Sequence, residues 1–115
     1  MVKRLAHLEG LSIFLLSCYL YWILQFDLVL FLAVFLLPDL SMVGYLIDKK
    51  LGALCYNLIH NYSTAVVFVI LGIAGEAPII TALGIILAAH IGIDRFLGYG
   101  LKYPTHFKDT HLQKL

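Results

Sequence analysis

The chain has 115 residues, of which 62% are hydrophobic, and its mean hydropathy is +0.94. A soluble domain is usually about 45–50% apolar, so this composition indicates a protein whose solvent is a lipid bilayer. The formal net charge of +1 excludes the strongly basic surface that a nucleic-acid partner requires. The length suits one domain.

Four apolar stretches are each long enough to cross a bilayer, which takes about 20 mainly apolar residues in a helix. They cover residues 5–24, 26–47, 51–73 and 78–97. None alternates polar and apolar residues as the strands of a membrane barrel do. The sequence therefore predicts an all-α protein: a four-helix transmembrane bundle with short loops over residues 1–97, followed by a cytoplasmic C-terminal tail over residues 98–115.

The first two stretches need interpretation. Lys3 and Arg4 precede the first stretch as in a signal peptide, but no small-residue cleavage pattern follows, so we expect it to remain as a span.

Pro38 interrupts the second stretch. A helix that ended there would extend only about 18 Å from Phe26, too short to cross the hydrocarbon core. We therefore expect a kinked helix that continues to about Ile47.

The third stretch is predicted to be one continuous span from Leu51 to Ile73. It carries Asn57 and His60 at helical spacing. Tyr56 lies near its cytoplasmic end, where tyrosine is typical of the membrane interface.

The fourth stretch has a row of small residues four apart, a pattern that lets helix backbones approach closely: Gly84, Ala88 and Gly92. His90 and Asp94 are also four apart and share the opposite face. We therefore expect this span to be packed on both sides.

The positive residues predict the orientation, because lysine and arginine collect in cytoplasmic loops. All eight fall at the N-terminus, between the second and third stretches, or at and beyond the end of the fourth: Lys3, Arg4, Lys49, Lys50, Arg95, Lys102, Lys108 and Lys114. The opposite loops contain Asp27 and Glu76 and no positive residue. The pattern predicts a multi-pass protein of the cell (inner) membrane with both termini in the cytoplasm.

Ionisable residues inside membrane spans are energetically costly and indicate functional sites. In the four-span interpretation Asp39 and His60 each lie about 13 Å from the cytoplasmic edge, and His90 lies about 10 Å from it. Glu9 is somewhat shallower. The four spans thus each place a polar group in the cytoplasmic half of the membrane.

Two histidines and two or three carboxylates on four helices are typical of a metal site in a bundle core. Imidazole and carboxylate together suit a divalent metal such as Zn, Mn or Fe. The predicted ligands are Asp39, His60, His90 and Asp94. In the same hypothesis Glu9 is a further ligand or a general base, and Arg95 steadies an anionic substrate. Asn57, the hydroxyl of Tyr45, and His111 in a tail that closes over the site are the supporting polar groups.

Three functions remain open from the residues alone. The first is a metal-dependent membrane hydrolase or transferase acting on an amphiphilic substrate. The second is a structural or partner-binding membrane protein in which the polar residues form a stabilising hydrogen-bond network. The third is a proton or ion carrier, which needs polar residues in the outer half as well. That half has few, so a carrier would need a homo-oligomer to form its path.

Several segments carry a family resemblance: "LEG" at 8–10, "LPDLSMVGY" at 37–45, "YNLIH" at 56–60 and "HIGIDRFLGYGLKYPTHFKDTHL" at 90–112. The chain resembles the domain-of-unknown-function family 4260, a group of small bacterial membrane proteins, over nearly its whole length. The resemblance implies a compact multi-span membrane protein and assigns no activity, cofactor or catalytic residue.

The chain is also similar, more faintly, to membrane-bound metal-dependent hydrolases, which combine a Pro-Asp pair, a histidine and a later H-x-x-x-D. The H-R-x-x-T-H-S block of those enzymes is absent, and "HNYST" at 60–64 stands in its place. The resemblance implies metal-ligand roles for Asp39, His60, His90 and Asp94.

Overall fold

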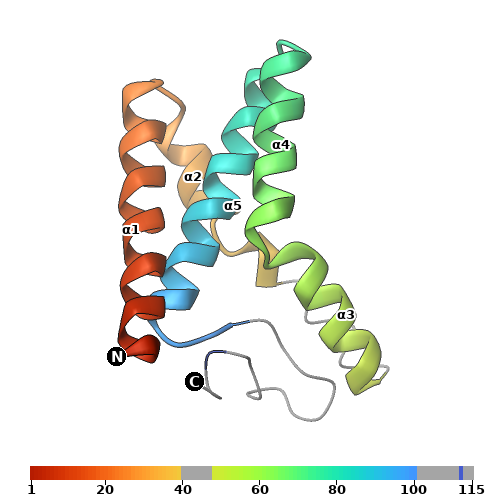
Figure 1. The fold of residues 1–115 in the computed structure, drawn as a ribbon. Helices are drawn as coiled ribbons and strands as arrows, with labels where there is room; N and C mark the ends of the chain where they lie inside the picture. Colours follow the sequence, from red (N-terminus) through yellow and green to blue (C-terminus); the bar gives the residue numbers. More distant parts are fainter. Residues whose placement is uncertain (40–47, 101–111, 113–115) are drawn as a thin grey trace.

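The computed structural model describes residues 1–39, 48–100 and 112, and all regular secondary structure in these residues is helical. Helices α1, α4 and α5 run side by side with α5 in the middle, and α2 covers α5 from another side (Figure 1). In chain order the helices are α1 (Val2–Ile23), α2 (Leu28–Val34), α3 (Lys49–Ile59), α4 (Tyr62–Ala74) and α5 (Pro78–Phe96).

Helices α1 and α5 are unbroken, and each is long and apolar enough to cross a membrane. They agree closely with the predicted first and fourth spans. Helix α5 begins with Pro78, whose missing N–H has no partner to lose at a helix start. It ends before Gly98, which adopts a φ of 97° that other residues rarely take.

Helices α1 and α5 touch backbone to backbone at a pair of glycines. A Cβ atom at Gly92 would lie 2.7 Å from the carbonyl oxygen of Gly10 and 2.7 Å from the backbone nitrogen of Phe14. On the same row of α5, a Cβ at Gly84 would lie 2.8 Å from the nitrogen of Val69 in α4. The small-residue row is confirmed as a packing surface, and it serves α1 and α4 at different levels.

Helix α2 is short because a proline follows it. Pro38 has no N–H to donate to the fourth carbonyl before it, and it disfavours helical geometry at Leu37. The α-helix therefore ends at Val34, and the chain closes into a tighter turn in which the Asp39 N–H donates to the Leu36 carbonyl at 3.1 Å. The predicted kinked helix is confirmed in part: the α-helix stops at Val34, but helical turns continue through Pro38 to Asp39. Its continuation over 40–47 lies outside the described residues.

The predicted third span is also broken. Helix α3 ends at Ile59, α4 begins at Tyr62, and the two axes bend by 44°. The signal for the break is Asn61, whose side chain caps α4 by accepting a hydrogen bond from the Thr64 N–H at 3.0 Å. Together α3 and α4 form a third candidate span, bent at His60.

A cluster of aromatic and aliphatic side chains fixes α2 against α1 and α5. Tyr21 of α1 is buried against Ile85 and Ile86 of α5, and its hydroxyl donates to the carbonyl of Asp27. The Asp27 side chain in turn caps α2 by accepting from the Val29 N–H at 2.9 Å. These contacts hold the start of α2 against α1 and α5.

Candidate metal centre

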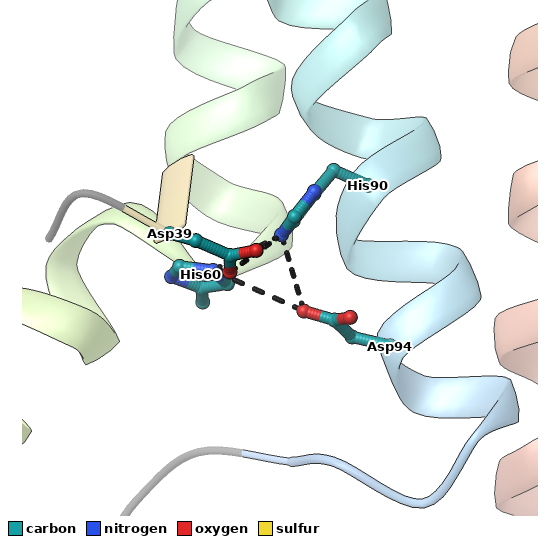
Figure 2. Close-up of side chains that lie close together, drawn as sticks. All are labelled: Asp39, His60, His90 and Asp94. Carbon is teal, nitrogen blue, oxygen red and sulfur yellow. Dashed lines mark hydrogen bonds and ion pairs between the residues drawn. The ribbon is translucent and has the colours of Figure 1, made fainter. Parts of the chain in front are cut away.

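Four side chains from three parts of the chain meet beside the two helix breaks (Figure 2). Asp39 follows the turn after α2, His60 lies at the bend between α3 and α4, and His90 and Asp94 stand one turn apart on α5. One ligand-type atom of each lies within 4.8 Å of those of the others. We call these residues the His–Asp cluster. The sequence predicted all four members.

His90 is the centre of the cluster. Its Nε2 atom lies 3.2 Å from Asp39 Oδ1, 3.2 Å from Asp94 Oδ2 and 3.2 Å from His60 Nε2. The His60 Nε2 atom lies 3.3 Å from Asp39 Oδ1 and 3.9 Å from Asp94 Oδ2. Both imidazoles therefore direct the same ring nitrogen toward both carboxylates.

The opposite ring nitrogens are fixed by backbone carbonyls. His90 Nδ1 lies 2.7 Å from the Phe35 carbonyl oxygen, and His60 Nδ1 lies 3.1 Å from that of Tyr56. A carbonyl only accepts hydrogen bonds, so each Nδ1 is the donor and carries the proton. In a neutral imidazole, Nε2 is then a lone-pair acceptor. A histidine that binds a metal through one ring nitrogen usually donates its other ring N–H to a carbonyl or carboxylate, as Nδ1 does here.

The Phe35 carbonyl is free for this role because of the proline break. In a continued α-helix that carbonyl would accept the N–H of Asp39, which here bonds to Leu36 instead. Pro38 thus ends α2, releases the carbonyl that orients His90, and places Asp39 beside it. One local sequence feature accounts for three parts of the site.

Four acceptor atoms consequently point at one another: two imidazole nitrogens and two carboxylate oxygens. Acceptors this close require a positive charge between them, either protons or a metal ion. Ligand atoms about 2.0–2.1 Å from a tetrahedral Zn²⁺ are about 3.3 Å apart. The distances of 3.2–3.3 Å around His90, and from His60 to Asp39, match this spacing. The distance from His60 Nε2 to Asp94 Oδ2 is longer, at 3.9 Å.

The cluster is enclosed on the histidine side and open on the carboxylate side. His60 and His90 are 1% and 2% exposed, whereas the side chains of Asp39 and Asp94 are 41% and 20% exposed. Water or a substrate atom can therefore reach the carboxylates while the imidazoles stay fixed.

Two aromatic residues support the imidazoles. The ring of Tyr56 stacks on that of His60, with centroids 3.8 Å apart and planes within 6°, and the ring of Phe35 meets His90 edge-on at 5.3 Å. Tyr56 is 1% exposed, so its predicted role as an interfacial anchor is wrong. Sequence reasoning missed both residues, because the groups that matter are their carbonyls and ring faces.

Arg95 contacts the bend at His60. Its Nη2 donates to the His60 carbonyl at 3.0 Å, its Nη1 donates to the Tyr99 carbonyl at 3.1 Å, and its guanidinium lies 5.8 Å from the centre of the Tyr62 ring. The side chain is buried. These contacts stabilise the carbonyl that the helix break leaves open. Its predicted contact with an anionic substrate stays a prediction.

The other predicted residues lie around the cluster. Glu9 is exposed on α1, outside the group of four, and lines a cavity of about 320 Å³ together with Arg95. Asn57 lies on α3 three residues before His60, and its carbonyl accepts from the Asn61 side chain at 2.6 Å. Tyr45 and His111, predicted as supporting polar groups, lie outside the described residues.

These features define a class: a small protein, helical in its described residues, with two helices long and apolar enough to cross a membrane and a His–Asp cluster whose histidines are buried. The chain belongs to the family described as a domain of unknown function (DUF4260), whose model matches residues 3–115. This confirms the resemblance drawn from the sequence. No curated protein and no solved structure matches the chain. The family description assigns no activity, so the function is argued from the site.

Proposed function

We propose that the His–Asp cluster binds a divalent metal ion (Zn, Mn or Fe) and that the protein is a metal-dependent membrane hydrolase. The observation that carries this proposal is the convergence of four acceptor atoms, with both imidazoles held from behind by carbonyls. A hydrogen-bond network would need added protons between these atoms. A metal satisfies all four at once.

The ligand set and its exposure fit hydrolysis. A bound divalent metal lowers the pKa of a coordinated water from about 15.7 to about 7. His60 and His90 hold their positions through their Nδ1 hydrogen bonds. The exposed Asp39 carboxylate directs Oδ1 into the cluster, so its other oxygen can receive a proton from the attacking water. The water oxygen bonds to an acyl or phosphoryl centre, the bond to the leaving oxygen breaks, and that oxygen takes up the proton.

The predicted membrane arrangement is part of the proposal: four spans, both termini cytoplasmic and a cytoplasmic tail over residues 98–115. The start of α1, the start of α3 and the end of α5 lie toward one end of the molecule (Figure 1). Those three ends carry Lys3, Arg4, Lys49, Lys50 and Arg95. Their common location supports a cytoplasmic site, because positive residues mark that side. The second span would include residues 40–47.

Metal analysis tests the binding step. We expect the protein purified without chelator to hold stoichiometric metal, and His90→Ala to hold none. His7→Ala is the matched control: His7 lies on α1 outside the His–Asp cluster, so metal content should be unchanged. A wild-type protein that is metal-free and takes up none of Zn²⁺, Mn²⁺ or Fe²⁺ would contradict the proposal.

A second measurement separates a metal site from the stabilising network that the sequence left open. In metal-free protein, Asp39→Asn replaces a repelling acceptor by an amide donor, so the free energy of unfolding should stay equal or rise. If the cluster were a hydrogen-bond network, the same change would cost about 1–3 kcal/mol. Asp27→Asn, which keeps the α2 cap, is the control.

The catalytic step has its own test. Metal-loaded protein should hydrolyse p-nitrophenyl acetate or p-nitrophenyl phosphate, the activity should disappear with a chelator, and His90→Ala should lack it. Bound metal without either activity would restrict the proposal to a structural metal site.

A further inference from the structure

A groove of about 450 Å³ opens among α2, α4 and α5 beside the His–Asp cluster. We call it the α2–α4 groove. Its lining residues are Val34, Leu37, Pro38, Ile59, Thr64, Phe68, Leu83, Ile86 and Leu87. Leu37 and Phe68 are 49% and 38% exposed, so the groove is open on its outer side.

The groove is connected to the cluster through the chain itself. Pro38 and Ile59 are the residues directly before Asp39 and His60, and Leu87 lies one turn before His90 on the same face of α5. A molecule in this groove therefore contacts the residues directly before two of the four cluster residues, and a residue one helical turn from a third.

The lining restricts what can occupy the groove. Among the described lining residues Thr64 has the one polar side chain, and its hydroxyl is already engaged, donating to the Leu58 carbonyl at 2.6 Å and accepting from the Asn61 side chain at 3.0 Å. None of these described side chains is charged. A polar or charged occupant would lose its hydration without compensation, so the chemistry selects a hydrocarbon chain.

A second groove provides an internal comparison. It lies among α1, α4 and α5, has a volume of about 480 Å³ and is also largely apolar. Its lining includes Ile70 and Ile73, and none of its described lining residues directly precedes or follows a cluster residue, the nearest being Tyr62 and Ala88, two residues away. Apolar surface of this kind is expected wherever helices face lipid. What distinguishes the α2–α4 groove is that Pro38 and Ile59 in its lining directly precede Asp39 and His60 of the cluster.

We infer that the α2–α4 groove receives the acyl chain of a membrane lipid whose polar end lies at the His–Asp cluster. The inference rests on the proposed metal site and names its substrate class. It requires a chain that enters from the bilayer and a head group that reaches the carboxylate side of the cluster.

The experiment uses two metal-binding probes, acetohydroxamic acid and dodecanohydroxamic acid, on metal-loaded full-length protein in lipid nanodiscs. Leu83→Trp fills the groove from α5, two turns away from His90. We expect the Kd of the long probe to rise at least about tenfold, the scale of overpacking a fitted site, while that of the short probe is unchanged. Ile70→Trp in the second groove should change neither value.

The outcomes separate the two proposals. If the wild type binds neither probe because it holds no metal, the proposed function fails. If Leu83→Trp retains the long probe with unchanged Kd, the acyl-chain inference fails while the metal site stands. If that variant holds no metal, Leu37→Trp at the more exposed side of the groove replaces it. A shift in oligomeric state in the groove variants, without loss of the long probe, would identify the groove as an interface between copies and overturn the inference.

Discussion

The two halves of this molecule differ in how their helices end. Helices α1 and α5 are unbroken and meet through Gly10 and Gly92 at backbone contact distance. The other half has two interruptions, after Val34 and at His60, and both lie beside the His–Asp cluster. The unbroken pair forms a scaffold, and the interruptions supply the polar backbone groups from which a site can be built.

The difference follows from what a membrane permits. A backbone carbonyl released inside a membrane must find a new partner, because no water is available there. Here the Phe35 carbonyl accepts a hydrogen bond from His90 Nδ1, and the His60 carbonyl accepts one from the Arg95 guanidinium. The helix breaks and the site therefore depend on each other.

The largest expected effect comes from breaking the scaffold. Gly92→Leu would place side-chain atoms into the backbone of α1, where even a Cβ has no room. We expect a loss of at least about 3 kcal/mol in the free energy of unfolding, or no folded protein. Thermal unfolding in detergent measures it, with Ala74→Leu on the exposed end of α4 as the control. Equal stability of the two variants would contradict the described crossing.

A smaller effect is expected from removing the support of the bend. Arg95→Met removes the guanidinium hydrogen bond to the His60 carbonyl, so metal affinity should fall about 10–100-fold, as for other groups that orient a ligand. Arg95→Lys keeps one donor and should recover part of the loss. Metal titration measures both variants. Unchanged metal affinity with a raised KM for an anionic substrate would instead favour the substrate role that the sequence suggested.

The smallest expected effect is the loss of stability and metal affinity when one of two helix caps is removed. Asn61 caps α4 at the bend, and Asp48 caps α3 at its far end by accepting from the Lys50 N–H at 2.7 Å. Replacing either by alanine should cost about 1 kcal/mol of stability. Metal affinity should fall only in Asn61→Ala, because only that cap holds the bend at His60. A similar loss of metal in Asp48→Ala would show that general destabilisation is responsible.

The sequence was most informative where a single physical rule determines the extent of a helix or the depth of a residue in it. Helices α1 and α5 follow from their uninterrupted apolar runs, and the cluster follows from comparing the depths of Asp39, His60 and His90. Depth is readable because each residue of a helix adds a fixed rise. The glycine row was readable for a similar reason, since small residues four apart share one face.

The breaks were harder to predict, because an apolar run does not show whether its helix is continuous. Pro38 indicated a disturbance, but the turn that ends α2 depends on bonds between the neighbouring backbone groups. Asn61 was present as a capping residue, and its signal was outweighed by the apolar residues on both sides. The role of the Tyr56 carbonyl carries no sequence signal, and Pro38 signals a released carbonyl without showing that the one of Phe35 orients His90.

The most direct test of the central claim is X-ray absorption spectroscopy of the zinc-loaded protein. The account predicts a shell of nitrogen and oxygen atoms at about 2.0–2.1 Å, with the outer scattering of imidazole rings, and loss of that outer scattering in His90→Ala. Sulfur scattering at about 2.3 Å, from Cys18 or Cys55, or a zinc ion without imidazole scattering, would contradict a metal site formed by the His–Asp cluster.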